Sequence, residues 1–140
     1  LLKPDLIQLH GSETPEQCIK IKLQTGIPLM KAIAINDSSD LNSIKQYIGK
    51  VDKFLFDSKF TPKKLNGLKN NTIDWNILKN YKENVNWVLA GGLTPNNIKE
   101  AINTSNSKSV DVSGGVEIKP GFKSSDLIMN FINNATSAYS

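Results

Sequence analysis

Arginine is absent from this chain of 140 residues, and all 17 of its basic residues are lysines. Arginine supplies the planar guanidinium fork that proteins use to bind nucleic-acid bases and backbone phosphates. The formal net charge of +4 would suit a nucleic-acid partner, but the lysines are scattered rather than gathered in a stripe. We therefore expect solvated faces and no nucleic-acid partner.

Cysteine and histidine occur once each, as Cys18 and His10. One cysteine cannot form an internal disulfide, which fits a reducing compartment, so we expect a cytoplasmic protein. Without a cluster of histidines and cysteines we expect no metal site. Cys18 resembles a small buried apolar residue, and the lone His10 is more typical of a hydrogen-bonded structural residue than of a base.

Long apolar runs are missing too, and no signal-peptide pattern opens the chain, so we expect no membrane partner. The composition is 39% hydrophobic and 21% charged, which is ordinary for a soluble domain, and we expect one domain over residues 1–140. The sequence begins "LLKPDLIQLHG" without a methionine and reaches an apolar run almost at once. This beginning is typical of a chain that starts in the middle of a fold.

A repeated unit is present instead: a short apolar run, a polar or glycine turn, then an amphipathic stretch. The runs are "DLIQLH" (5–10), "PLMKAIAI" (28–35), "KFLFD" (53–57), "NWVLA" (86–90) and "SVDVS" (109–113). Several are apolar nearly throughout, as in parallel strands covered on both faces, so the pattern predicts an α/β fold. The sheet is either open and doubly wound or part of a (β/α)8 barrel, because a complete barrel needs roughly 200 residues or more.

Helix starts follow most of these runs. Thr14 and Pro15 predict an N-cap and a first helical residue, with Gln17 completing a capping box, and Thr94 and Pro95 repeat the device. Two further helices are predicted to start near Asp74 and behind a serine cap in "KSSDLIMNFI". The side chains expected to point inward from them are Trp75, Ile77, Leu78, Leu127, Ile128, Phe131 and Ile132.

Two double glycines stand at the ends of the last two runs, in "LAGGL" and "DVSGG". Ligands of α/β proteins bind at the carboxyl ends of the strands. Without a Cβ, Gly91, Gly92, Gly114 and Gly115 would let a ligand approach the main-chain N–H groups, beside the helix start at Thr94. Plain turn chemistry is the alternative, but two pairs on neighbouring strand ends favour a phosphate site.

Four other residues are candidates for chemistry. Asp57 ends its run and is either a general acid or a cap of the following turn with Ser58. Asp111 is likewise either a residue that takes part in the reaction or one that only makes structural hydrogen bonds. Lys31 interrupts an apolar run and must reach the open end of the strand or meet a carboxylate. If that carboxylate were Asp57, the pair would hold Asp57 ionised and count against proton donation.

The segments "LIQLHG", "FLFDSK", "IDW", "LAGGLTPNNI" and "VDVSGGVEIKPGFKSSDLI" together resemble the phosphoribosylanthranilate isomerases of tryptophan biosynthesis, in the same order over essentially the whole chain. The resemblance implies strands 4 to 8 of a (β/α)8 barrel and an Amadori rearrangement of a sugar phosphate without a cofactor. It implies that Asp57 is the general acid that opens the ribose ring. It also implies that the two glycine pairs bind the phosphate, and that His10 and Asp111 line the substrate pocket, to which we also assign Lys31 from its place in the strand.

The chain departs from the family pattern in several places, which include Gly114 where serine is usual and Ser124 where an acid is usual. The family's base is a cysteine in a Cys-Gly turn after the first strand, a segment absent here, and Cys18 does not match it. An early arginine for the anthranilate carboxylate is also absent. The loop "KKLNGLKNNTIDW" is longer than the family's and keeps one glycine, Gly67, and its lysines could replace some anion contacts. We therefore expect a C-terminal fragment that is inactive alone, active once the preceding strands are restored, and monomeric or homodimeric at full length.

Other functions are compatible with these residues. Another phosphate-binding barrel enzyme is one, although a pentose-phosphate epimerase needs metal ligands and an indole-glycerol-phosphate synthase needs lysine and glutamate positions that we cannot assign. A non-catalytic, lysine-rich binding module is the other, and it predicts DNA binding that falls steeply with salt.

Overall fold

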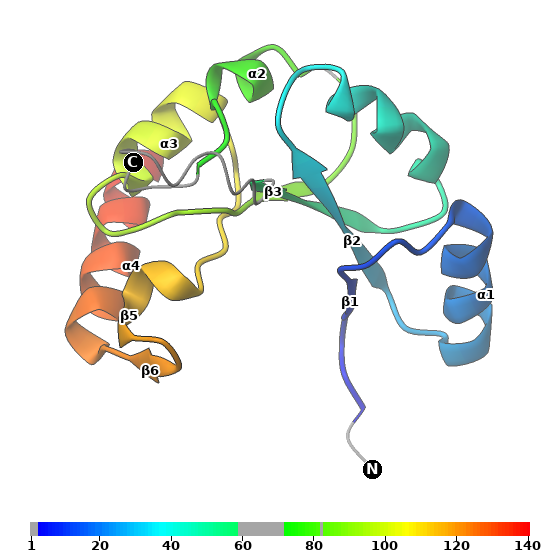
Figure 1. Ribbon diagram of the computed structural model, residues 1–140, viewed down its shortest axis with the longest axis horizontal. Helices are drawn as coiled ribbons and strands as arrows, with labels where there is room; N and C mark the ends of the chain where they lie inside the picture. Colours follow the sequence, from blue (N-terminus) through cyan, green and yellow to red (C-terminus); the bar gives the residue numbers. More distant parts are fainter. Residues whose placement is uncertain (1–2, 59–71, 82) are drawn as a thin grey trace.

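The computed structural model describes residues 3–58, 72–81 and 83–140. From β1 to α3 its strands and helices alternate along the chain, as predicted for an α/β protein (Figure 1). The strands are β1 (Ile7–Leu9), β2 (Leu29–Ile35), β3 (Lys53–Ser58), β4 (Trp87–Leu89), β5 (Glu117–Lys119) and β6 (Phe122–Lys123). The helices are α1 (Pro15–Thr25), α2 (Asn76–Lys79), α3 (Ile98–Ser105) and α4 (Ser125–Tyr139), with 3-10 turns η1 (Asp40–Tyr47) and η3 (Gly114–Val116).

The main sheet is parallel, with its strands side by side in chain order β1-β2-β3-β4. Four of the five predicted runs form these strands. The fifth run, 109–113, makes only a single parallel bridge from Val110 to Leu89. The bridge is held by the Leu89 N–H donating to Ser109 and the Asp111 N–H donating to Leu89, after which the chain turns into η3.

Helices cover one face of this sheet. Alternate strand residues such as Leu29, Ile33, Phe56 and Leu89 pack with the buried side chains of the helices in one large cluster. The other face carries a smaller buried cluster of Met30, Ala32, Leu55, Val88 and Ala90, to which no described helix contributes. Figure 1 shows the helices as an arc outside the strands.

The predicted capping box of α1 is confirmed. Thr14 Oγ1 accepts from the Gln17 N–H at 3.3 Å, and Gln17 Oε1 accepts from the Thr14 N–H at 2.7 Å. Pro15 is the first helical residue, and Cys18 is fully buried beneath the helix. These contacts fix where the chain goes immediately after β1.

The predicted start of α3 at Thr94 is wrong, since the helix begins at Ile98. The Asn97 side chain accepts the Thr94 N–H at 2.8 Å, and the Thr94 carbonyl accepts from the Ile98 N–H at 3.1 Å. Residues 94–97 therefore form a closed turn, and Thr94 contributes its main chain rather than a side-chain cap.

The two remaining predicted helices form with changed details. Ser124 caps α4 by accepting from the Leu127 N–H, and the buried residues of this helix are Phe131 and Ala135, whereas Ile132 is 51% exposed. Asp74 lies just before α2, where it accepts from the Asn76 N–H at 3.0 Å, and Leu78 is buried. Trp75 and Ile77 are partly buried against the core. In the described part of the chain, no helix combines the length and apolar character that crossing a bilayer requires.

Candidate phosphate and acid site

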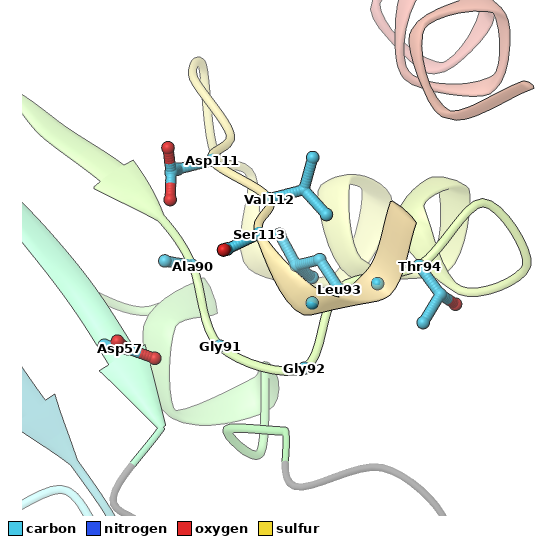
Figure 2. A pocket seen from close by; sticks show the side chains of 11 residues that line it. Asp57, Ala90, Gly91, Gly92, Leu93, Thr94, Asp111, Val112 and Ser113 are labelled. Atoms are coloured by element: carbon cyan, nitrogen blue, oxygen red, sulfur yellow. The ribbon is translucent and has the colours of Figure 1, made fainter. Parts of the chain in front are cut away.

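A cavity of about 420 Å³ opens at the carboxyl ends of β3, β4 and the Val110 segment (Figure 2). It is where the sequence analysis expected a ligand, because parallel strands end at a common edge. Its lining residues are Asp57, Ala90, Gly91, Gly92, Leu93, Thr94, Asp111, Val112, Ser113, Gly114 and Gly115. None of them carries a positive charge, and both glycine pairs share the cavity with two carboxylates.

The first glycine pair makes a turn that side chains would obstruct. Gly91 has φ 84° and Gly92 has φ 64°, both in the left-handed region that favours glycine. A Cβ on Gly91 would also lie 2.7 Å from Asp57 Oδ1 and would overlap the Ser58 main chain. Gly91 is therefore required by the neighbouring strand end, a close approach that the sequence could not reveal.

The two glycines of the second pair, Gly114 and Gly115, have different surroundings. A Cβ on Gly115 would overlap the Leu93 carbonyl group, so Gly115 lets η3 pack on the Gly91–Leu93 turn. A Cβ on Gly114 would meet nothing within 4 Å. Gly115 is therefore needed for a contact between the two loops, in line with the structural alternative for these glycines. Gly114 leaves open space in the cavity.

Both loops retain main-chain hydrogen-bond donors. Within the described residues, the N–H groups of Gly91, Gly92, Gly114 and Gly115 donate to no acceptor. Asn97 holds the first loop from behind, because its Nδ2 donates to the Gly92 carbonyl at 3.0 Å while its Oδ1 accepts from Thr94. Sequence reasoning missed Asn97, although an asparagine three residues after a Thr-Pro turn is a signal for such a bond.

The Asp57 carboxyl combines both of the roles considered for it. Its Oδ1 accepts from the Ser58 N–H at 2.7 Å, which is the predicted turn cap. Its Oδ2 lies 3.7 Å from His10 Nε2, and the side chain is 27% exposed. One oxygen is thus bonded to the main chain, and the other faces the His10 ring.

His10 stands beside this carboxyl but does not line the cavity. Its ring is 61% exposed, and the Gln8 Nε2 amide lies 3.1 Å from Nδ1. With Gln8 donating to Nδ1, the ring proton of neutral His10 is on Nε2, facing Asp57. Asp111 lines the cavity from the Val110 segment, and Figure 2 shows its carboxyl above the Gly91–Gly92 turn.

Lys31 meets a carboxylate, but not that of Asp57, which the sequence analysis considered as one possible partner. Strand residues alternate between faces, and Asp57 is in register with Ala34, an odd number of positions from Lys31. Lys31 therefore points to the helix-covered face and does not line the cavity. There its Nζ donates to the Gly11 carbonyl at 2.7 Å and to Glu13 Oε2 at 2.9 Å, with the side chain 3% exposed.

The Lys31–Glu13 pair fixes the loop that follows His10. Burial alone would raise the pKa of Glu13, but hydrogen bonds from Lys31 and from main-chain N–H groups outweigh it, so the pKa is lowered. The Gly11 N–H donates to Glu13 Oε2, and the Tyr47 hydroxyl donates to the Glu13 carbonyl. Lys31 thus has a carboxylate partner, as expected, but Glu13 rather than Asp57.

Two other expectations concern metal ligands and the long loop. Among residues 3–58, 72–81 and 83–140, no three histidines, cysteines or acidic residues lie close enough to hold a metal ion. Cys18 is buried on the helix-covered side, where burial raises the pKa of its thiol. Most of the segment "KKLNGLKNNTIDW", through residue 71, lies outside the described residues.

Comparison with known proteins places this geometry in a family. A model of the N-(5'-phosphoribosyl)anthranilate (PRA) isomerase family matches residues 1–134. An N-(5'-phosphoribosyl)anthranilate isomerase of Paramagnetospirillum magneticum is 47% identical over 133 residues, 94% of this chain and 61% of that protein. The chain spans about three fifths of the length of the curated relatives it matches.

Solved structures agree with the sequence match. The phosphoribosyl anthranilate isomerase of Thermotoga maritima has a TM-score of 0.80 at 35% identity, covering 95% of this chain and 62% of that one. A second solved isomerase has a TM-score of 0.76 at 33% identity, covering 95% of this chain and 60% of that one. That protein is in complex with reduced 1-(O-carboxyphenylamino)-1-deoxyribulose 5-phosphate.

Proposed function

Because the chain belongs to the N-(5'-phosphoribosyl)anthranilate isomerase family, we propose that it supplies the phosphate site and the general acid of such an isomerase in tryptophan biosynthesis. The reaction is the Amadori rearrangement of phosphoribosylanthranilate, an aminoaldose, to the carboxyphenylamino-deoxyribulose phosphate, an aminoketose. The solved relative that holds a reduced carboxyphenylamino-deoxyribulose phosphate supports a sugar phosphate as the ligand. The observation that carries the proposal is one cavity shared by Asp57 and both glycine loops.

We propose that β1 to β4 and the Val110 segment are strands 4 to 8 of a (β/α)8 barrel, within a single domain over residues 1–140. The position of the helices supports a barrel over an open doubly wound sheet, which carries helices on both faces. Here the described helices join only one of the two buried clusters. The other cluster then belongs to the interior of the barrel.

Phosphate binding would use the main chain. The N–H groups of Gly92 and Gly114 lie on two loops that meet at the cavity, and they have no acceptor within the described residues. Main-chain donors fixed in advance suit an anion because they need no reordering when it binds. Asn97 and the contact of Gly115 with Leu93 hold the two loops in place.

The acid step would use the second oxygen of Asp57. Oδ1 accepts from the Ser58 N–H, so we place the acidic proton on Oδ2, the oxygen without that bond. Transfer of that proton to the ribose ring oxygen lets the C1–O bond break, and the nitrogen lone pair then forms the C=N bond of the open-chain protonated imine. Removal of a proton from C2 by a base then gives the enol, which becomes the ketone.

His10 and Asp111 stand at the same mouth as pocket residues in this proposal, and Lys31 acts at a distance through the loop after His10. Cys18, the chain's single cysteine, is buried away from the cavity and is not the base. The fragment proposal therefore includes a base supplied by the preceding strands. We propose a cytoplasmic protein, monomeric or homodimeric at full length, and a dimeric relative from Thermotoga maritima supports the second state.

Turnover tests this proposal. Disappearance of phosphoribosylanthranilate is followed by its fluorescence, with the 140 residues alone and with the chain joined to the preceding strands of a family member. We expect no turnover from the first and turnover from the second. Turnover by the 140 residues alone contradicts the missing base, and an inactive joined protein that is folded contradicts the isomerase.

A salt titration of DNA binding separates the lysine-rich module from the enzyme. A module that binds DNA through its lysines loses affinity steeply as salt rises. We expect weak or absent binding at moderate salt.

A further inference from the structure

Of the described lysines, Lys123 is the one that hydrogen bonds to a residue lining the cavity. It lies on β6, which pairs antiparallel with β5 in a hairpin that the sequence analysis did not predict. Its Nζ donates to the Ser113 carbonyl at 2.8 Å, to Glu117 Oε1 at 2.8 Å and to Ser113 Oγ at 3.3 Å. An ammonium group has three donors, so all of them are engaged by these partners.

The hairpin holds Lys123 at the base of this loop. The Gly121 N–H donates to Glu117 Oε2 at 3.3 Å, and the Ser124 N–H donates to the Val116 carbonyl at 2.9 Å. Hydrogen bonds from Lys123 first and from Gly121 second lower the pKa of Glu117, so this carboxylate stays ionised. Lys123 is itself 44% exposed, so it is not a buried residue of the core.

The bond from Lys123 fixes the direction of one peptide group. In a trans peptide the carbonyl and the following N–H point in opposite directions. Because the Ser113 carbonyl faces Lys123, the Gly114 N–H faces away from it, on the opposite side of the same peptide plane. Gly114 lines the cavity, its Cβ position is open, and its N–H has no acceptor within the described residues.

We propose that Lys123 is a positioning residue for phosphate, which holds the Ser113–Gly114 peptide so that the Gly114 N–H is presented to the anion. This inference rests on the proposed phosphate site and adds a residue to it. Without Lys123, the Ser113 carbonyl loses its ammonium partner and keeps only the longer bond from the Val116 N–H at 3.4 Å, so the peptide is held less firmly. In the other glycine loop, the Asn97 side chain donates to a main-chain carbonyl, that of Gly92.

The test is a titration with ribose 5-phosphate, followed by the amide resonances of Gly92 and Gly114, with ribose as the phosphate-free control. Lys123→Met removes the tether and Lys123→Arg restores a cationic donor. Lys119→Met is the matched control, because Lys119 is on the same hairpin but packs over the Phe122 ring at 4.1 Å. Thermal unfolding of each variant checks the fold.

We expect both amides to shift in the unmodified chain, and Lys123→Met to weaken binding roughly tenfold to hundredfold. At saturating ligand Lys123→Met should lose the Gly114 shift and keep the Gly92 shift, whereas Lys123→Arg and Lys119→Met should behave like the unmodified chain. If Lys123→Met weakens the shifts of Gly92 and Gly114 equally, the lysine acts only through its positive charge, and the positioning role is overturned. Equal binding by Lys123→Met also overturns it but leaves the phosphate site standing. No shift at either glycine in the unmodified chain overturns the phosphate site and this inference together.

Discussion

Gly115 packs directly against Leu93, so closely that a methyl group at Gly115 would overlap the Leu93 carbonyl. The two loops that line the cavity therefore support each other through main-chain contact. The absence of a side chain at Gly115 serves this contact rather than the ligand. The ligand instead has the open space beside Gly114 and the donors of the left-handed turn at Gly91–Gly92.

Gly115→Ala should therefore destabilise the chain while Gly114→Ala should not. A methyl group at Gly115 meets main-chain atoms that cannot move cheaply, and overpacking of this kind costs about 1–3 kcal/mol. At Gly114 the same methyl group meets nothing within 4 Å. Urea unfolding of the two variants measures the difference, and equal stability would show that the loops can separate.

Lys31→Met should destabilise the fold by about 1–3 kcal/mol, because the partly exposed Glu13 carboxylate and the Gly11 carbonyl both lose the ammonium group as hydrogen-bond donor. Lys22→Met is the matched control. Lys22 pairs with Asp52, and the two side chains are 39% and 40% exposed. Surface ion pairs of this kind contribute about 0–1 kcal/mol to the free energy of unfolding. The double variant Lys31→Met/Glu13→Gln should recover part of the loss. Chemical unfolding compares the three proteins, and similar losses for Lys31→Met and Lys22→Met would count against the buried pair.

The free energy of unfolding should fall at alkaline pH because of the Tyr81 phenol. Burial first, and the Glu83 carboxylate second, raise the pKa of Tyr81 from 10.0 to about 12. Between these values the unfolded chain releases the phenol proton while the folded chain keeps it, so stability is intact below pH 10 and declines above it. Tyr81→Phe keeps the edge-on ring contact with Phe56 and should flatten this decline. Unfolding measured from pH 9 to 12 would show no difference between the two proteins if the phenol were not involved.

Asp57→Asn should reduce turnover by roughly 10²–10⁴-fold in the protein that includes the preceding strands, which is the usual contribution of a general acid. Asparagine keeps an oxygen that can accept from the Ser58 N–H, so the turn should survive. Substrate affinity should change little, and kcat and KM measured separately distinguish the two effects. A loss confined to KM would assign Asp57 to binding.

The strands and the site at their ends could be predicted because both follow from local patterns. Apolar runs marked β1 to β4, and the ends of parallel strands meet at one edge, which brought Asp57 near both glycine loops. The capping box at Thr14 was equally local, since each partner lies within three residues of the other.

Lys31 and Thr94 have contacts that could not be predicted from the sequence. The partner of Lys31 depends on the register between β2 and β3, which sets the face that each side chain occupies and cannot be read from one strand. The Thr94 N–H donates to the Asn97 side chain, as the N–H of a capping residue would, but α3 begins only at Ile98, after the turn at residues 94–97. The contact of Gly115 with Leu93 depends on how two loops meet, and a glycine in a sequence does not tell whether a ligand or another loop needs the space.

A crystal structure of the chain with the reduced carboxyphenylamino-deoxyribulose phosphate tests the central claim most directly. We predict the phosphate group within about 3 Å of the main-chain nitrogens of Gly92 and of Gly114 or Gly115, with the sugar directed towards Asp57. A phosphate group bound away from both glycine loops would contradict the account.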